Sequence, residues 1–90
     1  MFYTYILQSE KNGRYYVGSC NDVNERLKRH NNGSVLSTKG YLPWKVIYTE
    51  TYQTLSEARK REYQIKSWKR RSAIESLIKH FNLEIEDPRF

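Results

Sequence analysis

Tyr5, Tyr16, Arg26 and His30 are residues of this chain whose types and spacing could do chemistry. Phenols and imidazoles can exchange protons, and a guanidinium can neutralise an anion. A phenol serves as a base, however, only where cations or hydrogen bonds lower its pKa. Each residue also has an ordinary interpretation, because strand tyrosines fill half-buried surfaces, exposed arginines are solvated, and a histidine near a helix end interacts with the last carbonyls. The elements that position these side chains decide between the two interpretations.

The two tyrosines fall on two predicted strands of one hairpin. The segments from Phe2 to Leu7 and from Tyr15 to Cys20 are rich in Tyr, Ile, Val and Thr, which suit a pleated, half-buried surface. The Asn-Gly pair at positions 12–13 supplies the positive φ angles of a tight turn. Pairing across a two- or four-residue loop joins odd to even positions, so Tyr5 and Tyr16 are expected to share one face of the hairpin.

A helix is predicted directly after the hairpin, ending at His30. Asp22 and Glu25 have the spacing of a capping box, and the Asn-Gly pair at 32–33 supplies a left-handed stop. Arg26 and His30 are four positions apart and therefore neighbours on one face of this helix. The tyrosines, the arginine and the histidine are expected to converge where the hairpin meets the helix.

These motifs resemble those of the GIY-YIG nuclease superfamily. The second motif of that superfamily is present as YVG at 16–18, the first in altered form as YTY at 3–5, and the step from Tyr5 to Tyr16 fits the family spacing. Arg26, His30 and, in the segment KREYQIK, Glu62 match further family positions. The resemblance runs from about residue 2 to about residue 79 and is greatest to small stand-alone bacterial members.

The resemblance implies a divalent-metal-dependent DNA endonuclease that hydrolyses phosphodiester bonds with Mg²⁺ or Mn²⁺, in DNA repair or recombination. It also implies catalytic roles for Tyr5, Tyr16, Arg26 and His30. The family asparagine on or after the last helix could only be Asn82, which lies later than expected.

Glu62 is the expected metal ligand. It lies on the apolar stripe of its predicted helix, between Ala58 and Ile65, where an unpaired carboxylate is costly. A divalent cation would compensate its charge, and Mg²⁺ is commonly held by one or two carboxylates with waters and phosphate oxygens. The alternative is an ordinary salt bridge to Arg59 or Lys66 on the same helix.

The charge of the chain favours a nucleic-acid partner. Its 16 Lys and Arg outnumber 10 Asp and Glu, giving a formal charge of +6, and basic surfaces attract polyanions. Between Arg59 and Arg71, seven cations accompany one anion, Glu62. The residues expected to contact nucleic acid are Lys28, Arg29, Lys39, Lys66, Lys69 and Arg70.

The whole sequence predicts one α/β (α+β) domain of order ββαβαα, with a three-stranded antiparallel sheet flanked by helices. Residues 34–43 are expected to form a loop, and residues 44–52 a strand with Trp44, Val46 and Tyr48 on its buried face. Capping boxes at Thr54 and Ser72 begin the last two helices. The domain is expected to span 1–81, with a C-terminal tail at 82–90.

Several classes of protein and site are excluded or disfavoured. Cys20 is the single cysteine, so neither an intrachain disulfide nor a cysteine-rich zinc site is expected. The apolar runs are too short for a membrane span, which favours a cytoplasmic protein. Two rival functions stay open: a catalytically weak nucleic-acid-binding module whose protein partner supplies cleavage or targeting, and a protein–protein adaptor.

Overall fold

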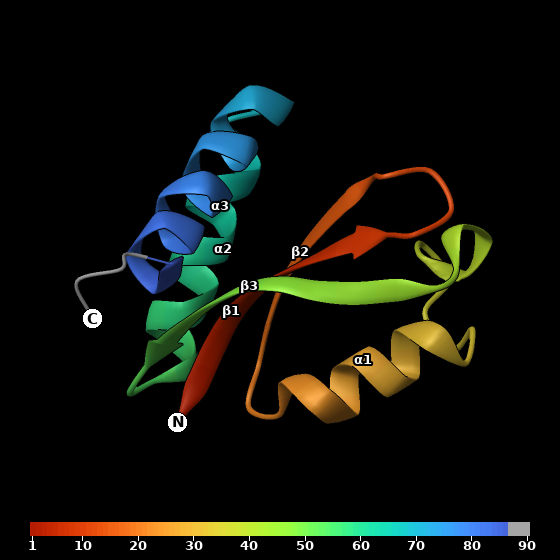
Figure 1. Ribbon diagram of the computed structural model, residues 1–90. Coiled ribbons are helices and arrows are strands. Elements are labelled where there is room, and N and C mark those ends of the chain that lie inside the picture. Colours follow the sequence, from red (N-terminus) through yellow and green to blue (C-terminus); the bar gives the residue numbers. More distant parts are fainter. Residues whose placement is uncertain (87–90) are drawn as a thin grey trace.

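The computed structural model describes residues 1–86, with side chains as far as His80. Three antiparallel strands form one sheet in the order β2-β1-β3. Helix α1 lies on one side of this sheet, and α2 and α3 lie together on the other (Figure 1). The elements are β1 (Phe2–Ser9), β2 (Tyr15–Cys20), α1 (Val23–Asn31), the 3₁₀ helix η1 (Lys39–Tyr41), β3 (Trp44–Tyr52), α2 (Leu55–Ser67) and α3 (Arg71–Glu86). The predicted α+β class and ββαβαα order are confirmed.

The hairpin of β1 and β2 places the two tyrosines as the sequence predicts. Tyr5 pairs with Gly18 and Leu7 with Tyr16, so odd positions of β1 face even positions of β2. In the connecting turn only Gly13 has a positive φ, of 78°. The expectation of two left-handed residues is therefore wrong, because the turn closes over four residues, with the Gly13 amide donating to the Ser9 carbonyl at 2.9 Å.

Two of the three predicted helix caps are present. The side chain of Asp22 accepts from the Glu25 amide at 3.0 Å, and that of Thr54 from the Glu57 amide at 3.2 Å. The third prediction is wrong, because α3 begins at Arg71 and leaves Ser72 inside its first turn. Glu75, three residues after Ser72 and so at the position that would complete a capping box, pairs instead with Arg71 at 2.8 Å.

Strand β3 has the predicted bounds but carries an irregularity. Ile6 pairs with Tyr48 and Leu7 with Val46, so Ile47 is an extra residue opposite β1. Such a bulge reverses the alternation of the strand. Trp44 and Val46 consequently pack on the side of α1, whereas Tyr48 packs on the side of α2 and α3. The prediction that these three side chains share one buried face is therefore wrong.

Both faces of the sheet are covered by apolar side chains, and each face has its own core. The α1 side contains Tyr5, Leu7, Cys20 and Trp44, and the opposite side contains Ile6, Val17, Tyr48 and Ile65. A buried hydrogen bond of 2.7 Å from the Thr4 hydroxyl to the Ala58 carbonyl ties β1 to α2. The sheet is thus the middle of three layers.

Helix α3 continues past residue 81, the end predicted for the domain, as far as Glu86. The segment 82–86 is therefore helical, and the remaining residues 87–90 of the predicted tail lie outside the described residues. The side chain of Asn82, the one candidate for the family asparagine, is also outside the described part. Within residues 1–86, no helix combines the length and the apolar content needed to cross a membrane.

Candidate active site

The phenol of Tyr5 passes over the edge strand β2 at Gly18. A Cβ atom on Gly18 would lie 2.5 Å from the Tyr5 hydroxyl oxygen and 2.6 Å from Cζ of that ring. Real Cβ atoms do not come so close to another heavy atom, so the position admits only glycine while the ring keeps its place. The glycine two positions after Tyr16 therefore leaves the room that the Tyr5 ring and hydroxyl occupy.

Tyr5, His30 and Thr38 form a buried chain of polar contacts. The Tyr5 hydroxyl oxygen lies 3.3 Å from His30 Nε2, and His30 Nδ1 lies 2.9 Å from Thr38 Oγ1. Each of the three residues is 1% exposed. The structure brings Tyr5 and His30 together, as the sequence predicts, and adds a threonine from the segment that the sequence identified only as a loop.

Tyr16 lies against both members of this pair. Its ring centroid is 4.7 Å from that of His30 and 6.4 Å from that of Tyr5. From the other side of the sheet, Lys66 Nζ approaches to 6.0 Å from the Tyr16 centroid. Tyr16 is half-buried, so its ring is more accessible than that of Tyr5. The two phenols thus differ in environment although they share one face of the hairpin.

Arg26 lies half-buried on α1, and its charge acts on both buried groups. Burial lowers the pKa of His30, and the nearby Arg26 guanidinium lowers it further. Burial also raises the pKa of Tyr5, assisted by Tyr16 and Cys20 and opposed by Arg26. Arg26 does lower the pKa of this phenol, but burial outweighs the cation and the net shift is upward. Tyr5 therefore stays a neutral phenol and His30 a neutral imidazole near pH 7.

Glu62 reaches the same edge of the sheet from α2. One of its oxygens accepts from the Ser19 hydroxyl at 2.6 Å and the other from Lys66 Nζ at 2.5 Å. Its side chain is 14% exposed, whereas that of Lys66 is 46% exposed. Its charge also raises the pKa of Tyr5. The salt bridge to Lys66, offered by the sequence as the alternative to a metal, is therefore present, and Glu62 still lies close to the tyrosines.

Sequence and structure comparisons agree on the family. A family model described as the GIY-YIG catalytic domain matches residues 1–75. The chain belongs to the GIY-YIG family. Its curated relatives include a UPF0213 protein of Staphylococcus epidermidis, 41% identical over 76 residues that cover 83% of this chain and 92% of the relative. Another is a UPF0213 protein of Staphylococcus aureus, 41% identical over 73 residues that cover 80% of this chain and 88% of the relative.

A solved structure agrees with this assignment. The solution NMR structure of a UPF0213 protein from Bacillus halodurans matches with a TM-score of 0.56 and 32% identity, over 88% of this chain and 84% of that chain. The chain is thus a small single-domain member of a nuclease superfamily. Nucleases of the GIY-YIG type generally depend on a divalent metal.

Among the described side chains, the tyrosine site offers a metal one carboxylate, that of Glu62. No cluster of three or more His, Cys, Asp or Glu side chains occurs within the described residues. Glu62 is the carboxylate beside Tyr5 and Ser19, and its Lys66 partner is exposed enough to move away. One carboxylate with waters and substrate phosphate oxygens is an ordinary way to hold Mg²⁺. The site therefore fits a metal that is bound together with the substrate.

A basic groove runs from the tyrosines toward the start of α3. Its lining joins Tyr15 and Tyr16 of β2 to Lys66 of α2 and to the cations around the α2–α3 connection. Three predicted contact residues, Lys66, Lys69 and Arg70, line this groove. Arg71, the last cation of the 59–71 run, lines it too. Arg14 also lines it, and sequence reasoning missed this residue; its position just before the second motif was the available signal. The cations of the groove are Arg14, Lys66, Lys69, Arg70 and Arg71.

The remaining predicted contact residues lie elsewhere. Lys28 and Arg29 are exposed on α1, where Arg29 pairs with Glu25 at 2.6 Å. Lys39 is exposed in η1. None of the three lines the basic groove. The structure therefore separates the predicted cations into a groove set and an α1-side set.

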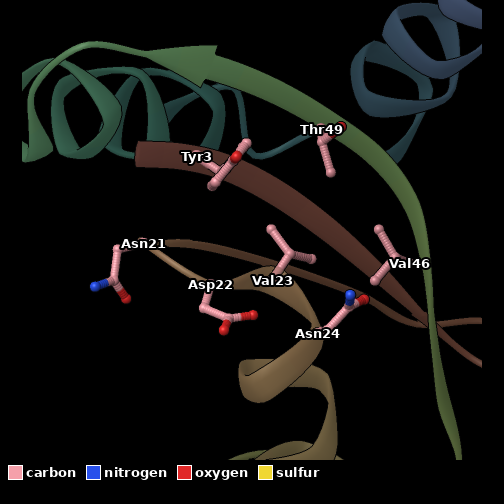
Figure 2. A pocket seen from close by; sticks show the side chains of 7 residues that line it. All are labelled: Tyr3, Asn21, Asp22, Val23, Asn24, Val46 and Thr49. Carbon is pink, nitrogen blue, oxygen red and sulfur yellow. The ribbon is translucent and has the colours of Figure 1, made fainter. Parts of the chain in front are cut away.

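A second hollow lies between the start of α1 and the sheet (Figure 2). Val23 points toward the strands there, and Tyr3, Val46 and Thr49 line the opposite wall. The polar residues at 21, 22 and 24 line its other side. It contains none of the residues predicted for chemistry, so it is separate from the tyrosine cluster.

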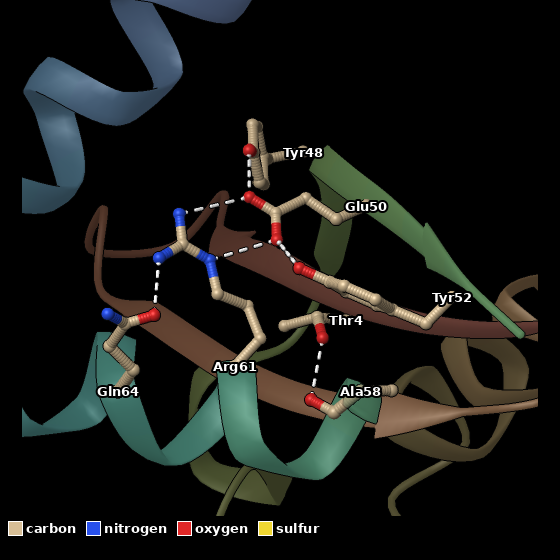
Figure 3. A network of polar contacts seen from close by, with 7 residues as sticks. All are labelled: Thr4, Tyr48, Glu50, Tyr52, Ala58, Arg61 and Gln64. Carbon is tan, nitrogen blue, oxygen red and sulfur yellow. Dashed lines mark hydrogen bonds and ion pairs between the residues drawn. The ribbon is translucent and has the colours of Figure 1, made fainter. Parts of the chain in front are cut away.

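A second polar cluster lies on the α2 side of the sheet (Figure 3). Glu50 of β3 accepts from Arg61 Nε at 2.9 Å and Nη2 at 3.2 Å, from the Tyr52 hydroxyl at 2.6 Å, and from the Tyr48 hydroxyl. Burial opposes ionisation of Glu50, but the hydrogen bonds from Arg61, Tyr48 and Tyr52 lower its pKa on balance. Burial and the bond to Glu50 raise the pKa of Tyr52 to about 12. No local sequence pattern indicated this cluster.

Proposed function

We propose that this chain is a divalent-metal-dependent DNA endonuclease that hydrolyses phosphodiester bonds, with Mg²⁺ or Mn²⁺ as the cofactor. The observation that carries the proposal is the meeting of Tyr5, Tyr16, His30 and Glu62, which come from β1, β2, α1 and α2, at one edge of the sheet. Membership of a nuclease superfamily supports it. Hydrolysis adds a water oxygen to phosphorus and breaks one P–O ester bond.

The two phenols take different roles in this proposal. Tyr16, half-buried and facing Lys66, positions or deprotonates the attacking water. Tyr5, buried and hydrogen-bonded to His30, keeps its hydroxyl proton and fixes the edge of the site. A neutral histidine suits this role, because an imidazole nitrogen without a proton can accept the hydrogen bond of the phenol.

Arg26 and Glu62 are proposed to compensate the negative charge of the phosphate, Arg26 directly and Glu62 through the metal. A guanidinium beside the phenols stabilises the negative charge that develops on the phosphate oxygens. Glu62 would hold the metal, together with waters and a phosphate oxygen, once Lys66 turns away toward solvent. The metal supplies charge neutralisation and orientation of the phosphate.

DNA is proposed to lie in the basic groove with its backbone leading to Tyr16. Five cations from two separated segments face this groove, and contacts to phosphates position nucleic acid without reading its sequence. Arg71 stacks on the Tyr15 ring at 4.4 Å from its centroid, which gives the groove a flat wall. Lys28, Arg29 and Lys39 would contact more distant phosphates.

The test is direct incubation of purified protein with duplex, single-stranded and branched DNA, each with Mg²⁺, with Mn²⁺ and with a chelator. Shorter fragments are expected only with metal. Intact DNA in every reaction, together with retained binding, would instead support the catalytically weak nucleic-acid-binding module that needs a protein partner.

A further inference from the structure

Thr38 touches His30 on the ring nitrogen opposite Tyr5. Its Oγ1 is 2.9 Å from His30 Nδ1 and 3.3 Å from the Val35 carbonyl oxygen. Thr38 is itself held from both directions, since its amide donates to Val35 at 3.1 Å and its carbonyl accepts from the Trp44 indole at 3.0 Å. The hydroxyl of this threonine, a residue that is 1% exposed, is therefore fixed in place beside the imidazole.

The donors and acceptors around His30 determine which of its ring nitrogens carries the proton. A carbonyl can only accept, so the bond between Thr38 and Val35 uses the threonine proton and leaves an Oγ1 lone pair for His30. His30 Nδ1 then carries the proton and donates to Thr38, while Nε2 is bare and accepts from Tyr5. Every buried donor has an acceptor in this arrangement.

The opposite tautomer of His30, with the proton on Nε2, leaves the buried hydroxyl proton of Tyr5 without an acceptor. If Thr38 donated to Nδ1, the proton would sit on Nε2 and point at the Tyr5 oxygen. The Tyr5 proton would then need another acceptor, and His30 is its one hydrogen-bond partner among the described residues. A buried hydroxyl without an acceptor costs roughly 1–3 kcal/mol, which disfavours this arrangement.

We infer that Thr38 is a positioning residue, which holds His30 in the tautomer whose Nε2 lone pair faces the Tyr5 hydroxyl. Thr38 is not among the residues that line the groove, and its side chain bonds to His30 and Val35; it therefore acts through His30. The catalytic consequence rests on the proposed nuclease activity: the imidazole accepts the hydrogen bond of Tyr5 and so fixes the direction of that hydroxyl in the site. The tautomer itself does not depend on any activity.

The tautomer can be read from long-range ¹H–¹⁵N correlations of the imidazole in uniformly ¹⁵N-labelled, untagged protein at neutral pH. The chain has two histidines, and His80→Gln, an exposed position on α3, leaves His30 as the only signal. We expect Nε2 to show the shift of an unprotonated nitrogen. A protonated Nε2 in this parent spectrum overturns the inference, and this measurement needs no variant at Thr38.

Two substitutions at Thr38 then separate positioning from packing. Thr38→Val keeps the shape and removes the acceptor, so the ring should move toward the Nε2-protonated tautomer and kcat should fall about tenfold with KM unchanged. Thr38→Ser keeps the hydroxyl and should restore both the spectrum and kcat. The indole signal of Trp44, bonded to the Thr38 carbonyl, reports whether the loop stays folded.

The outcomes distinguish this inference from the proposed function. An unchanged imidazole spectrum in Thr38→Val, or an equal loss of kcat in the Ser and Val variants, would make Thr38 a packing residue and overturn the inference. A parent protein that shows the expected tautomer but cuts no DNA would overturn the nuclease proposal alone.

Discussion

Arg61 and Glu62 are consecutive residues of α2, yet they belong to polar clusters of opposite character. Arg61 pairs with Glu50, whose two oxygens accept four hydrogen bonds from Arg61, Tyr48 and Tyr52. Glu62 accepts two, from Ser19 and from the exposed Lys66. A carboxylate offers about four lone-pair sites, so Glu50 is saturated and Glu62 retains capacity for a further ligand.

This difference separates a structural carboxylate from one available for chemistry. All the donors of Glu50 come from buried or partly buried side chains, including an arginine that is 22% exposed, and a ligand that displaced this arginine would leave its charge unpaired. Lys66 is 46% exposed and can turn toward solvent, whereas the Glu62 carboxylate is only 14% exposed and then needs another cation to compensate its charge. Substitutions in the Glu62 cluster should therefore lower the cleavage rate, whereas matched substitutions in the Glu50 cluster should lower the stability of the fold.

Replacing the two carboxylates by glutamine gives the largest expected contrast. Glu62→Gln keeps the shape and removes the charge that would hold the metal, so cleavage should fall by roughly 10³-fold or more. DNA binding should persist. The measurement is cleavage rate over a range of Mg²⁺ and Mn²⁺ concentrations, with Glu50→Gln as the control that keeps its rate while folded. A Glu62→Gln protein that still cuts at any metal concentration would contradict the metal role.

Removing the hydroxyl groups of tyrosines tests the same difference between the two clusters, with a smaller expected effect. Tyr5→Phe and Tyr16→Phe keep the packed rings and should each slow hydrolysis by roughly 10²-fold if proton transfer or water positioning is lost. Affinity for DNA should barely change. Tyr52→Phe, which loses a bond to Glu50, is the matched control and should cut at the parental rate. Parental rates in both test variants would return these tyrosines to a packing role.

The saturated cluster should in turn control stability. Glu50→Gln removes the charge that accepts from Arg61 and two phenols, so the free energy of unfolding at neutral pH should fall by about 2 kcal/mol, measured by urea titration. Glu62→Gln should lower it by less than Glu50→Gln does, because it removes two hydrogen bonds to a carboxylate rather than four and its amide oxygen can still accept from Ser19. Equal losses in the two variants would remove the distinction between the clusters.

Low pH should abolish the contribution of the ionised Glu50 to the free energy of unfolding. The pKa of Glu50 is lowered in the folded protein from its ordinary value of 4.5, so its stabilisation is present above that value and is lost as the pH falls through the folded pKa. The difference in unfolding free energy between parent and Glu50→Gln should therefore shrink below about pH 4.5. A difference that stays constant down to acid pH would show that the charge of Glu50 is not responsible.

Charge reversal in the basic groove has the smallest expected effect. Lys69→Glu with Arg70→Glu leaves the Glu62–Lys66 pair intact and should weaken DNA binding about tenfold at low salt, with a shallower salt dependence. Lys28→Glu with Arg29→Glu on α1 is the matched control. A larger loss in the α1 variant would move the DNA surface to that side of the domain.

Sequence alone predicted what depends on neighbours in the chain. The caps at Asp22 and Thr54, the turn at Gly13 and the shared face of Tyr5 and Tyr16 all follow from local spacing, and the structure contains them. The contact between Tyr5 and His30 could be predicted from the sequence, because a single short helix follows directly after the hairpin.

The features that sequence missed depend on pairing between distant segments. The bulge at Ile47 exists only opposite β1, and the fourfold bonding of Glu50 requires α2 to lie over β3. Thr38 sits in a segment without periodicity, so nothing local indicates that it is buried under a histidine. The α3 cap at Ser72 failed because Lys69 takes a left-handed conformation, with a φ of 53°, and the next helix begins at Arg71.

The extra residue at Ile47 also restricts how β3 can join the sheet as the chain folds. A strictly alternating strand that slips by two residues still offers the same side chains to the same face. Here the apolar side chains change sides at one point, opposite Ile6 and Leu7, so a slipped strand would match one layer and leave the other without its partners. Only the native alignment lets the side chains of β3 pack correctly on both faces of the sheet. We therefore expect few misaligned folding intermediates. We also expect the two cores to form and unfold together in one cooperative transition.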